Sequence, residues 1–259
     1  MLRKRLLAAV IVREKRAVQS FGYNKWLPLG NVQCVVENLD RWGADGIVVL
    51  CTDRKNQGPD LELLRSLCSL DLSTPLSYGG GISNSTQALE AVQAGAERLI
   101  LDQVLDKNPT EVINMAAAVG KQALIASVPV IRTSGGIAQR WKYWEKKQRP
   151  LEQWLTDNCW RECISEILAI DVKAEGHNRG LNIELLEELS ILGVPLLGFG
   201  GLSMPCQITE VLKKPFVSAV VIGNALNYEE NMIAKLKDNL HELPLRPHPS
   251  NKTYNSINQ

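Results

Sequence analysis

Two glycine pairs in this sequence have the composition of phosphate-binding turns. Gly80-Gly81 and Gly200-Gly201 each follow a short apolar run, and they lie 120 residues apart. Glycine allows a steep backbone turn and lets an oxyanion approach bare N–H groups. The next apolar run in each half ends beside Gln103 or beside Gly223-Asn224. We therefore predict two phosphate sites: the first rim (Gly80, Gly81 and Gln103) and the second rim (Gly200, Gly201, Gly223 and Asn224).

The alternative is that both glycine pairs form only tight turns, but the matched flanking residues favour ligand binding. Asp102 precedes Gln103 and would repel a phosphate unless it is turned away or neutralised. The second rim lacks such an acid and is the safer prediction. A short helix after the last apolar run would add further N–H donors there.

Three carboxylates at or just after the ends of apolar runs are the candidates for acid–base catalysis. They are Asp171, Asp53 and Glu175. Asp102, Arg13 and Tyr78 are further polar candidates for chemistry near strand ends. A carboxylate at the carboxyl end of a barrel strand more often serves a ligand or catalysis than packing. His177 is a weaker candidate: histidine as a residue type can change charge near neutral pH, but an exposed loop histidine is usually inert. The three histidines and six cysteines show no metal-binding spacing, so we expect no metal and no other cofactor.

The elements that must carry these residues alternate between apolar runs and amphipathic stretches. Continuous apolar runs suit parallel strands that are covered on both faces. Eight such units in 259 residues predict a (β/α)8 barrel, with one domain over residues 1–243 and a disordered tail over residues 244–259. The expected strands are Leu6–Val12, Gly46–Cys51, Pro75–Tyr78, Arg98–Asp102, Ala123–Val128, Glu166–Asp171, Pro195–Gly198 and Ser218–Ile222. The expected helices are Val32–Trp42, Leu61–Leu70, Thr86–Ala94, Thr110–Val119, Leu151–Cys163, Ile183–Leu192, Pro205–Lys213 and Glu229–Leu240.

The sequence also repeats itself at a spacing close to 120 residues. Pro75–Ser83 aligns with Pro195–Ser203, and Leu99–Gln103 aligns with Val220–Asn224. This period is too long for a solenoid, but it fits two fused halves of four units each. We therefore expect a barrel with a two-fold half-barrel repeat.

Composition narrows the classes of partner. The chain is 45% apolar with a formal net charge of +1, which does not indicate a nucleic-acid or membrane-surface partner. The apolar run after Lys4-Arg5 is too short for a signal peptide, and no run approaches the ~18 residues of a membrane span. We expect a soluble, cytoplasmic protein whose cysteines are core thiols, with Cys159 and Cys163 on one helix.

Six short motifs occur in an order that is more specific than any one of them: Lys4-Arg5, Tyr78–Ile82, Asn108-Pro109, Gly120–Ala123, Glu166–Leu168 and Gly200-Gly201. Together they resemble the HisF family, the cyclase subunit of imidazole glycerol phosphate synthase, from Met1 to about Leu240. The resemblance implies a two-fold-repeated barrel that binds a substrate with a phosphate at each end. It also implies a glutaminase partner at the N-terminal face and ammonia that passes through the barrel.

The chain departs from that family at the positions that carry its chemistry. The family places aspartates at the ends of the first and fifth strands, where this chain has Ile11 and Pro129. Neither residue can transfer a proton, a contribution of roughly 10²–10⁴-fold per group. Gln19 replaces the family's mobile lysine, and Cys51 replaces the aspartate of the second strand. The resemblance is therefore to a divergent paralogue, in which ordinary imidazole glycerol phosphate synthesis is not expected.

In the same family, a ring of charged residues closes the barrel bottom and admits ammonia. The aligned positions here are Arg5, Gly46, Arg98 and Glu166. Because burying an unpaired charge is costly, Glu166 should pair with Arg5 or Arg98. A structural salt bridge and an ammonia gate fit these residues equally well. The replacement at Gly46 would leave the ring wider.

Residues 132–150 combine basic and aromatic side chains. Such a mixture can bind nucleic acid, but it also fits a hairpin that the family carries after its fifth strand. The neutral net charge favours the hairpin, which would cover an anionic ligand at the barrel mouth. The residues concerned are Arg140, Lys142, Lys146, Lys147 and Arg149 among Trp141, Tyr143 and Trp144.

Two functions of different classes remain open. The first is a HisF-like synthase subunit that uses ammonia from a glutaminase on a phosphorylated or nucleotide-linked substrate, either as in the histidine pathway or to form an amidino-sugar for surface polysaccharide. The second is a catalytically silent, phosphate-binding barrel that acts as a scaffold or regulates the glutaminase. A phosphosugar isomerase is a weaker third option, because it also needs carboxylates where this chain has Ile11 and Pro129.

Overall fold

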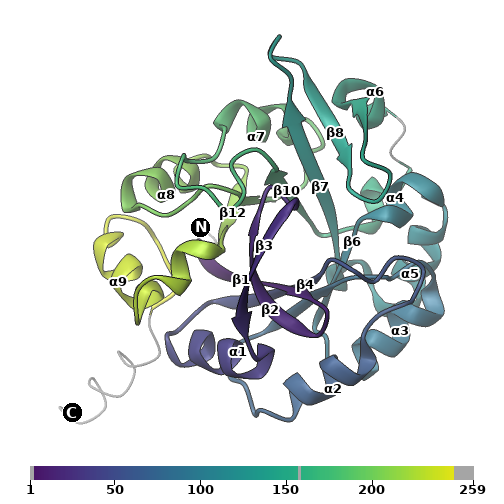
Figure 1. Ribbon diagram of the computed structural model, residues 1–259. Helices are drawn as coiled ribbons and strands as arrows, with labels where there is room; N and C mark the ends of the chain where they lie inside the picture. The colour runs from purple at the N-terminus through teal and green to yellow at the C-terminus, as the bar shows by residue number, and fades with distance from the viewer. Residues whose placement is uncertain (1–2, 157–158, 248–259) are drawn as a thin grey trace.

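A closed ring of eight parallel strands forms the centre of the molecule (Figure 1). The computed structural model describes residues 3–156 and 159–247. Neighbouring strands of the ring pair in parallel, and the pairing of β10 with β7 closes it. The predicted (β/α)8 barrel is confirmed. Its strands are β1 (Arg5–Arg13), β4 (Gly46–Cys51), β5 (Leu76–Gly79), β6 (Arg98–Leu101), β7 (Leu124–Arg132), β10 (Glu166–Asp171), β11 (Leu196–Phe199) and β12 (Val217–Ile222).

Helices cover the outside of the ring and connect its strands (Figure 1). Several begin at an asparagine whose side chain accepts a hydrogen bond from a backbone N–H three residues further on, as at Asn31, Asn84 and Asn182. The α-helices are α1 (Val32–Arg41), α2 (Leu61–Cys68), α3 (Ser85–Gln93), α4 (Gln103–Lys107), α5 (Glu111–Val119), α6 (Leu151–Thr156), α7 (Ile183–Ser190), α8 (Pro205–Leu212) and α9 (Met232–Asn239). The 3₁₀ turns are η1 (Lys121–Ala123), η2 (Arg161–Cys163) and η3 (Asn224–Asn227).

One predicted helix, over Leu151–Cys163, is wrong. The structure has α6 and then η2 in its place, and residues 157–158 lie outside the described part of the chain. Trp154 and Trp160 are both buried, with ring centroids 5.2 Å apart. Side chains six positions apart point in widely different directions on a continuous helix, so burying both indoles together requires the helix to end.

The prediction that the cysteines are core thiols is correct only for Cys51, which is buried. Cys163 is half-buried and ends η2, so the expected helix that would carry both Cys159 and Cys163 is not formed. The remaining cysteines lie on outward faces of helices or turns and are exposed: Cys34, Cys68, Cys159 and Cys206.

Two apolar layers hold the barrel together. One lies between the ring and the helices. The other fills the inside of the ring, where Leu7, Val48, Leu168 and Val221 are each at most 5% exposed. The barrel interior is therefore a packed core that fixes the strand ends, and with them the side chains at the mouth.

Two hairpins extend the barrel, one from the first strand of each half. β2 (Arg16–Phe21) and β3 (Lys25–Gly30) follow β1, and β8 (Ala138–Lys142) and β9 (Lys147–Pro150) follow β7. The second hairpin was predicted and is confirmed. The first occupies a segment that the sequence indicated only as a loop, although its Gly22-Tyr23 turn with positive φ at both residues is typical of a tight hairpin.

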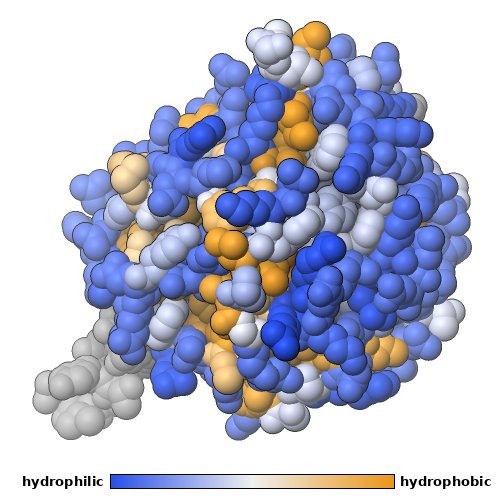
Figure 2. Space-filling model, viewed as in Figure 1, coloured by the Kyte–Doolittle hydropathy of each residue, from blue (hydrophilic) through white to orange (hydrophobic). Residues whose placement is uncertain are grey.

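The first hairpin crosses the centre of the ring in Figure 1. Figure 2 shows hydrophobic side chains gathered at the centre of the same face, with hydrophilic ones around them. Leu27 and Leu29 of β3 are among the exposed hydrophobic residues, at 41% and 37%. The mouth of the barrel is thus covered, and its centre is more apolar than its surroundings.

The predicted tail begins at Pro244, and its residues 248–259 lie outside the described part of the chain. The backbone N–H of Lys4 donates to the carbonyl of Pro244, and Lys4 forms a β-bridge with Leu245. Among the described residues, no helix is long and apolar enough to cross a membrane.

Candidate active site

The two glycine turns occupy equivalent places in the two halves of the barrel. Gly80-Gly81 follows β5 and Gly200-Gly201 follows β11, and all four residues have positive φ. A Cβ on the second glycine of each pair would lie 2.3 Å from the carbonyl oxygen of Gly58 or 2.6 Å from that of Gly180. The turns therefore require glycine so that the preceding loop can approach, with or without a ligand.

The backbone after each turn leaves donors free. Within the described part of the chain, no acceptor bonds the N–H groups of Gly81 and Ile82 or those of Gly201 and Leu202. Unpaired N–H groups at the end of a strand are available to an anion. Phosphate binding at the two rims remains a prediction. The two rims differ, however, in the space and the side chains around them.

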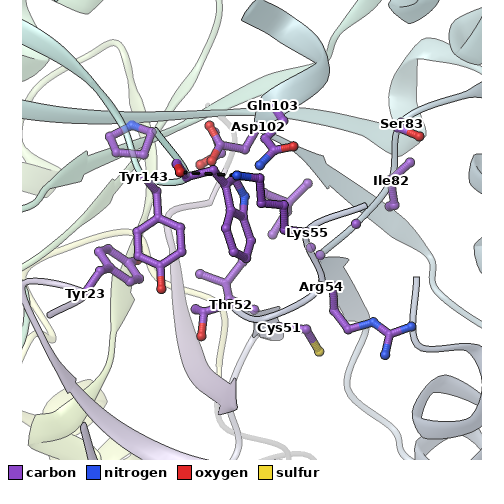
Figure 3. Close-up of a pocket in the computed structure, with 18 of the residues that line it drawn as sticks. Tyr23, Cys51, Thr52, Arg54, Lys55, Ile82, Ser83, Asp102, Gln103 and Tyr143 are labelled. Atoms are coloured by element: carbon purple, nitrogen blue, oxygen red, sulfur yellow. Dashed lines mark hydrogen bonds between the residues drawn. The ribbon is translucent and has the colours of Figure 1, made fainter. Parts of the chain in front are cut away.

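A pocket of about 130 Å³ lies at the first rim (Figure 3). All three predicted residues of that rim line it. Lys55 extends into the pocket, whereas Arg54 points away from it (Figure 3) and donates to the carbonyl of Gly58 in its own loop. Both hairpins contribute aromatic side chains to its walls: Tyr23, Trp141, Tyr143 and Trp144.

Three residues that line this pocket each have a buried polar atom without a hydrogen-bond partner among the described residues. They are the hydroxyl of Tyr23, Nε2 of Gln103 and Nε1 of Trp141. These atoms are not exposed to the pocket in this conformation, so a ligand would reach them only when the side chains turn. Buried polar groups in proteins are nearly always satisfied, and three unpaired ones beside one pocket favour a ligand there. Burial raises the pKa of Tyr23 well above its usual value, which keeps its hydroxyl protonated and able to donate.

The carboxylate of Asp102 at this rim is neutralised. The fully buried guanidinium of Arg140, from β8, forms ion pairs with Asp102 and, at 3.2 Å, with Asp106. Trp154 Nε1 also donates to Asp106 at 3.0 Å. Burial raises the pKa of Asp102 and Arg140 opposes that shift. The objection that an acid would repel an anion at the first rim is therefore removed by the second hairpin.

The second rim is covered by the first hairpin. The side-chain amide of Asn224 donates to the carbonyl of Ser20 at 2.8 Å and accepts from the N–H of Ser20 at 3.3 Å. Gly200, Gly201 and Gly223 line the same depression, whose volume is only about 10 Å³. In this conformation the amide of Asn224 already serves the hairpin, so this rim offers little room.

The three predicted catalytic carboxylates are not brought together. Asp53 accepts from the N–H of Glu14 at 2.6 Å, and Asp171 accepts from the N–H groups of Lys173 and Ala174 in its own loop, both at 3.1 Å. Neither lines the pocket at the first rim. Their hydrogen bonds hold loops in place.

Glu175 lies buried beneath the first hairpin. Its carboxylate accepts from Ser20 Oγ at 3.0 Å and from the N–H of Tyr23 at 3.2 Å. Burial raises its pKa to about 7, although these hydrogen bonds favour the ionised form. Glu175 therefore holds the backbone of Tyr23, whose ring lines the pocket, but Glu175 does not line the pocket itself.

Among the described residues that line the pocket, Asp102 is the acid. The aromatic residues Tyr23, Trp141, Tyr143 and Trp144 were not predicted as site residues. Tyr23 and Tyr143 occupy equivalent positions of the two hairpins, 120 residues apart, and their rings lie 5.9 Å apart. The internal repeat, extended to the hairpins, was the signal that could have identified this pair.

At the opposite, N-terminal end of the ring, Glu166 forms ion pairs with both Arg5 and Arg98 and accepts from Ser218 Oγ at 2.7 Å. The predicted pairing is confirmed for both arginines. Burial opposes the charge of Glu166, but the arginines outweigh it and lower its pKa. The ring of charged residues is not wider at Gly46. The side chain of Leu7 fills the space there, since its Cδ2 would lie 2.9 Å from a Cβ placed on Gly46.

A model of the histidine biosynthesis protein family matches residues 5–232, nearly the whole barrel. This chain belongs to the histidine biosynthesis protein family. It is 26% identical over 260 residues to the putative imidazole glycerol phosphate synthase subunit hisF2 of Vibrio vulnificus, which covers 97% of this chain and 93% of that protein. It is 25% identical to the imidazole glycerol phosphate synthase subunit HisF of Bacillus cereus, over 93% of this chain and 96% of that protein.

This member of the histidine biosynthesis protein family is a divergent, HisF-like one. Ile11 is 4% exposed and packs with the apolar residues inside the ring, and Pro129 is buried and lines the pocket at the first rim. Gln19 lies in β2 and is buried. The mouth therefore has no ionisable side chain at the two positions where the resemblance places aspartates. Among the described residues, no cluster of His, Cys, Asp or Glu is arranged to hold a metal ion.

Proposed function

We propose that this protein is the synthase subunit of a glutamine amidotransferase, which receives ammonia from a separate glutaminase and adds it to a phosphorylated or nucleotide-linked substrate at the first rim. One observation carries the proposal: the bridged ring of Arg5, Arg98 and Glu166 and the ligand-sized pocket lie at opposite ends of one barrel. Membership of a family whose relatives are named as synthase subunits supports it. The complex would act in the cytoplasm.

In this proposal Asp102 carries the proton transfer that Ile11 and Pro129 cannot. Ammonia that attacks an electrophilic carbon must lose a proton, and a leaving group must gain one. Asp102 is the carboxylate that lines the pocket, and Arg140 fixes its orientation. Asp102→Asn should lower turnover by roughly 10²–10⁴-fold. Asp53→Asn, a matched change at an acid outside the pocket, should leave turnover unchanged.

The test is co-expression of the full chain with the glutaminase of its own genome, followed by assay of glutamine hydrolysis and of ammonia incorporation. We expect a stable complex in which glutamine hydrolysis rises and product forms. Glu166→Gln should reduce product formation from glutamine more than product formation from added ammonium chloride. In the proposal, only ammonia released from glutamine enters through the charged ring that contains Glu166. Failure of the two chains to associate would contradict the proposal.

A second function, a silent scaffold that regulates the glutaminase, is favoured by one observation: apolar side chains at Ile11 and Pro129. It predicts a complex in which glutamine hydrolysis rises but Asp102→Asn changes nothing. The effect of that one variant distinguishes the two functions.

A further inference from the structure

We propose that the pocket at the first rim binds a nucleoside diphosphate unit, with the base among the aromatic residues of the two hairpins and the phosphates at the Gly80-Gly81 turn. This inference rests on the proposed function, since it names the substrate class of the same site. It depends on three features of the pocket: an aromatic enclosure, unsatisfied donors and a neutralised anion end.

The aromatic enclosure comes from turns that are far apart in sequence. Tyr143 and Trp144 pack edge to face with centroids 4.8 Å apart, and Tyr23 packs against Tyr143 at 5.9 Å. With Trp141 they form one wall of the pocket. Aromatic side chains stack on nucleobases whatever the base, because each base has a π-face. A phosphosugar alone would leave this wall without a planar partner.

The unsatisfied donors require a ligand rich in acceptors. Gln103 Nε2 and Trp141 Nε1 can only donate, and both are buried without a partner among the described residues. The edge of a base such as uracil presents carbonyl oxygens, and a diphosphate presents several more oxygens. An apolar ring would leave both donors unpaired and would bind poorly.

The anion end lies on the side of the glycine turn. The N–H groups of Gly81 and Ile82 are free within the described part of the chain. Lys55 extends into the pocket (Figure 3), and its ammonium donates to the carbonyl of Trp144 at 3.5 Å, between the turn and the aromatic residues. Arg140 neutralises Asp102 beside them. A base stacked on the aromatic wall thus has an anion-binding turn on the other side of the same pocket.

The pocket has room for a nucleobase. About 130 Å³ holds roughly ten water molecules by the same measure. This space is enough for a base with its substituents, while the pocket stays open for the rest of the ligand. Uridine diphosphate, whose base has a single ring, is the smallest such probe.

The experiment is calorimetric titration of the purified full chain with uridine diphosphate, inorganic diphosphate and uridine, followed in parallel by tryptophan fluorescence. Uridine diphosphate should bind more tightly than either part. Trp144→Ala should weaken it about tenfold or more by removing a stacking ring, with under about twofold effect on inorganic diphosphate. Trp141→Phe keeps a ring and loses the donor, so about three- to tenfold is expected.

Ile137→Ala is the matched control, because Ile137 lies in the same hairpin segment and is 60% exposed. It should change none of the three affinities, and a thermal melt of each variant should show that the barrel is intact. Equal binding of inorganic diphosphate and uridine diphosphate would overturn the inference, as would no binding of either. If ammonia transfer from the glutaminase still operates in that case, the inference fails and the proposed function survives.

Discussion

The two rims of this barrel are built from equivalent positions, yet one is open and the other is filled. Gln103 and Asn224 correspond at a spacing of 121 residues. Nε2 of Gln103 lacks a partner among the described residues, whereas the amide of Asn224 bonds Ser20 in both directions. The same glycine turn therefore serves as the floor of a pocket in one half and as a packed joint in the other.

The difference arises in the hairpin that covers each rim. Arg140 of the second hairpin and Ser20 of the first stand at equivalent positions. The long side chain of Arg140 reaches Asp102 and Asp106. The second hairpin is thus held to the first rim through a side chain, and the pocket remains beside it. At Ser20 the backbone itself lies on Asn224, which closes the space. Side-chain length at one position thus separates a binding rim from a structural one.

The largest effect should come from removing the clamp of the open rim. Arg140→Ala leaves Asp102 and the buried Asp106 without their guanidinium, which should lower the free energy of unfolding by about 3–5 kcal/mol. Ser20→Ala, the equivalent change at the filled rim, removes one hydroxyl that bonds Glu175 and should cost about 1 kcal/mol. Urea unfolding of both variants measures the difference. Equal losses would show that the two rims are held in the same way.

The filled rim should also depend on pH through Glu175. Its pKa is raised from 4.5 to about 7, so the folded chain binds the proton more tightly than the unfolded chain does. Stability should therefore fall as pH rises from about 4.5 to about 7, by roughly 3 kcal/mol from this group. In Glu175→Gln that slope should disappear, relative to wild type and to the exposed control Glu152→Gln. Urea unfolding across this range tests it, and an unchanged slope in Glu175→Gln would contradict it.

Glycine is needed at both rims because of the geometry of the turn, whether or not a ligand binds there. A Cβ at Gly81 would lie 2.3 Å from a backbone oxygen, at φ 75°. Gly81→Ala should therefore cost about 2 kcal/mol or more. At Gly136, φ is 81° with nothing within 4 Å of a Cβ, so Gly136→Ala should cost only about 1–2 kcal/mol. Urea unfolding of the two variants measures the difference. Similar midpoints for Gly81→Ala and Gly136→Ala would show that the loop beside Gly81 moves to accommodate a Cβ at little cost.

The barrel was predictable because hydrophobic runs and their spacing are written along the chain. β4 and β10 begin and end where their apolar runs do. The interruption after Thr156 was not predictable, since it depends on Trp154 meeting Trp160 in three dimensions. The first hairpin was missed because its strands are short and β3 is mostly exposed, and only its Gly22-Tyr23 turn indicates it.

The site was less predictable than the fold. Gly80 and Gln103 were identified as site residues from their position at strand ends, which the local backbone fixes, and both line the pocket. The same criterion also selected Asp53, whose carboxylate bonds the backbone at Glu14, and Asp171, whose carboxylate bonds its own loop. Position at a strand end does not indicate the direction in which a side chain points. Asp102 was predicted both as a candidate for chemistry and as an obstacle to phosphate. The sequence does not show that it is neutralised by Arg140, 38 residues further on, in a hairpin that folds back over the rim.

The smallest stability effect gives the sharpest test of the comparison between the rims. Asn224→Ala leaves the buried N–H and carbonyl of Ser20 unpaired and should cost about 1–3 kcal/mol. Gln103→Ala removes an amide whose Nε2 has no partner among the described residues, so the cost should be under about 0.5 kcal/mol. With uridine diphosphate the order should reverse: Gln103→Ala should weaken binding about three- to tenfold, and Asn224→Ala should leave it unchanged. Unfolding curves and titrations of the same two proteins provide both measurements. If Gln103→Ala were the more destabilising change, Gln103 would be a structural residue and the first rim would not be a site kept open for a ligand.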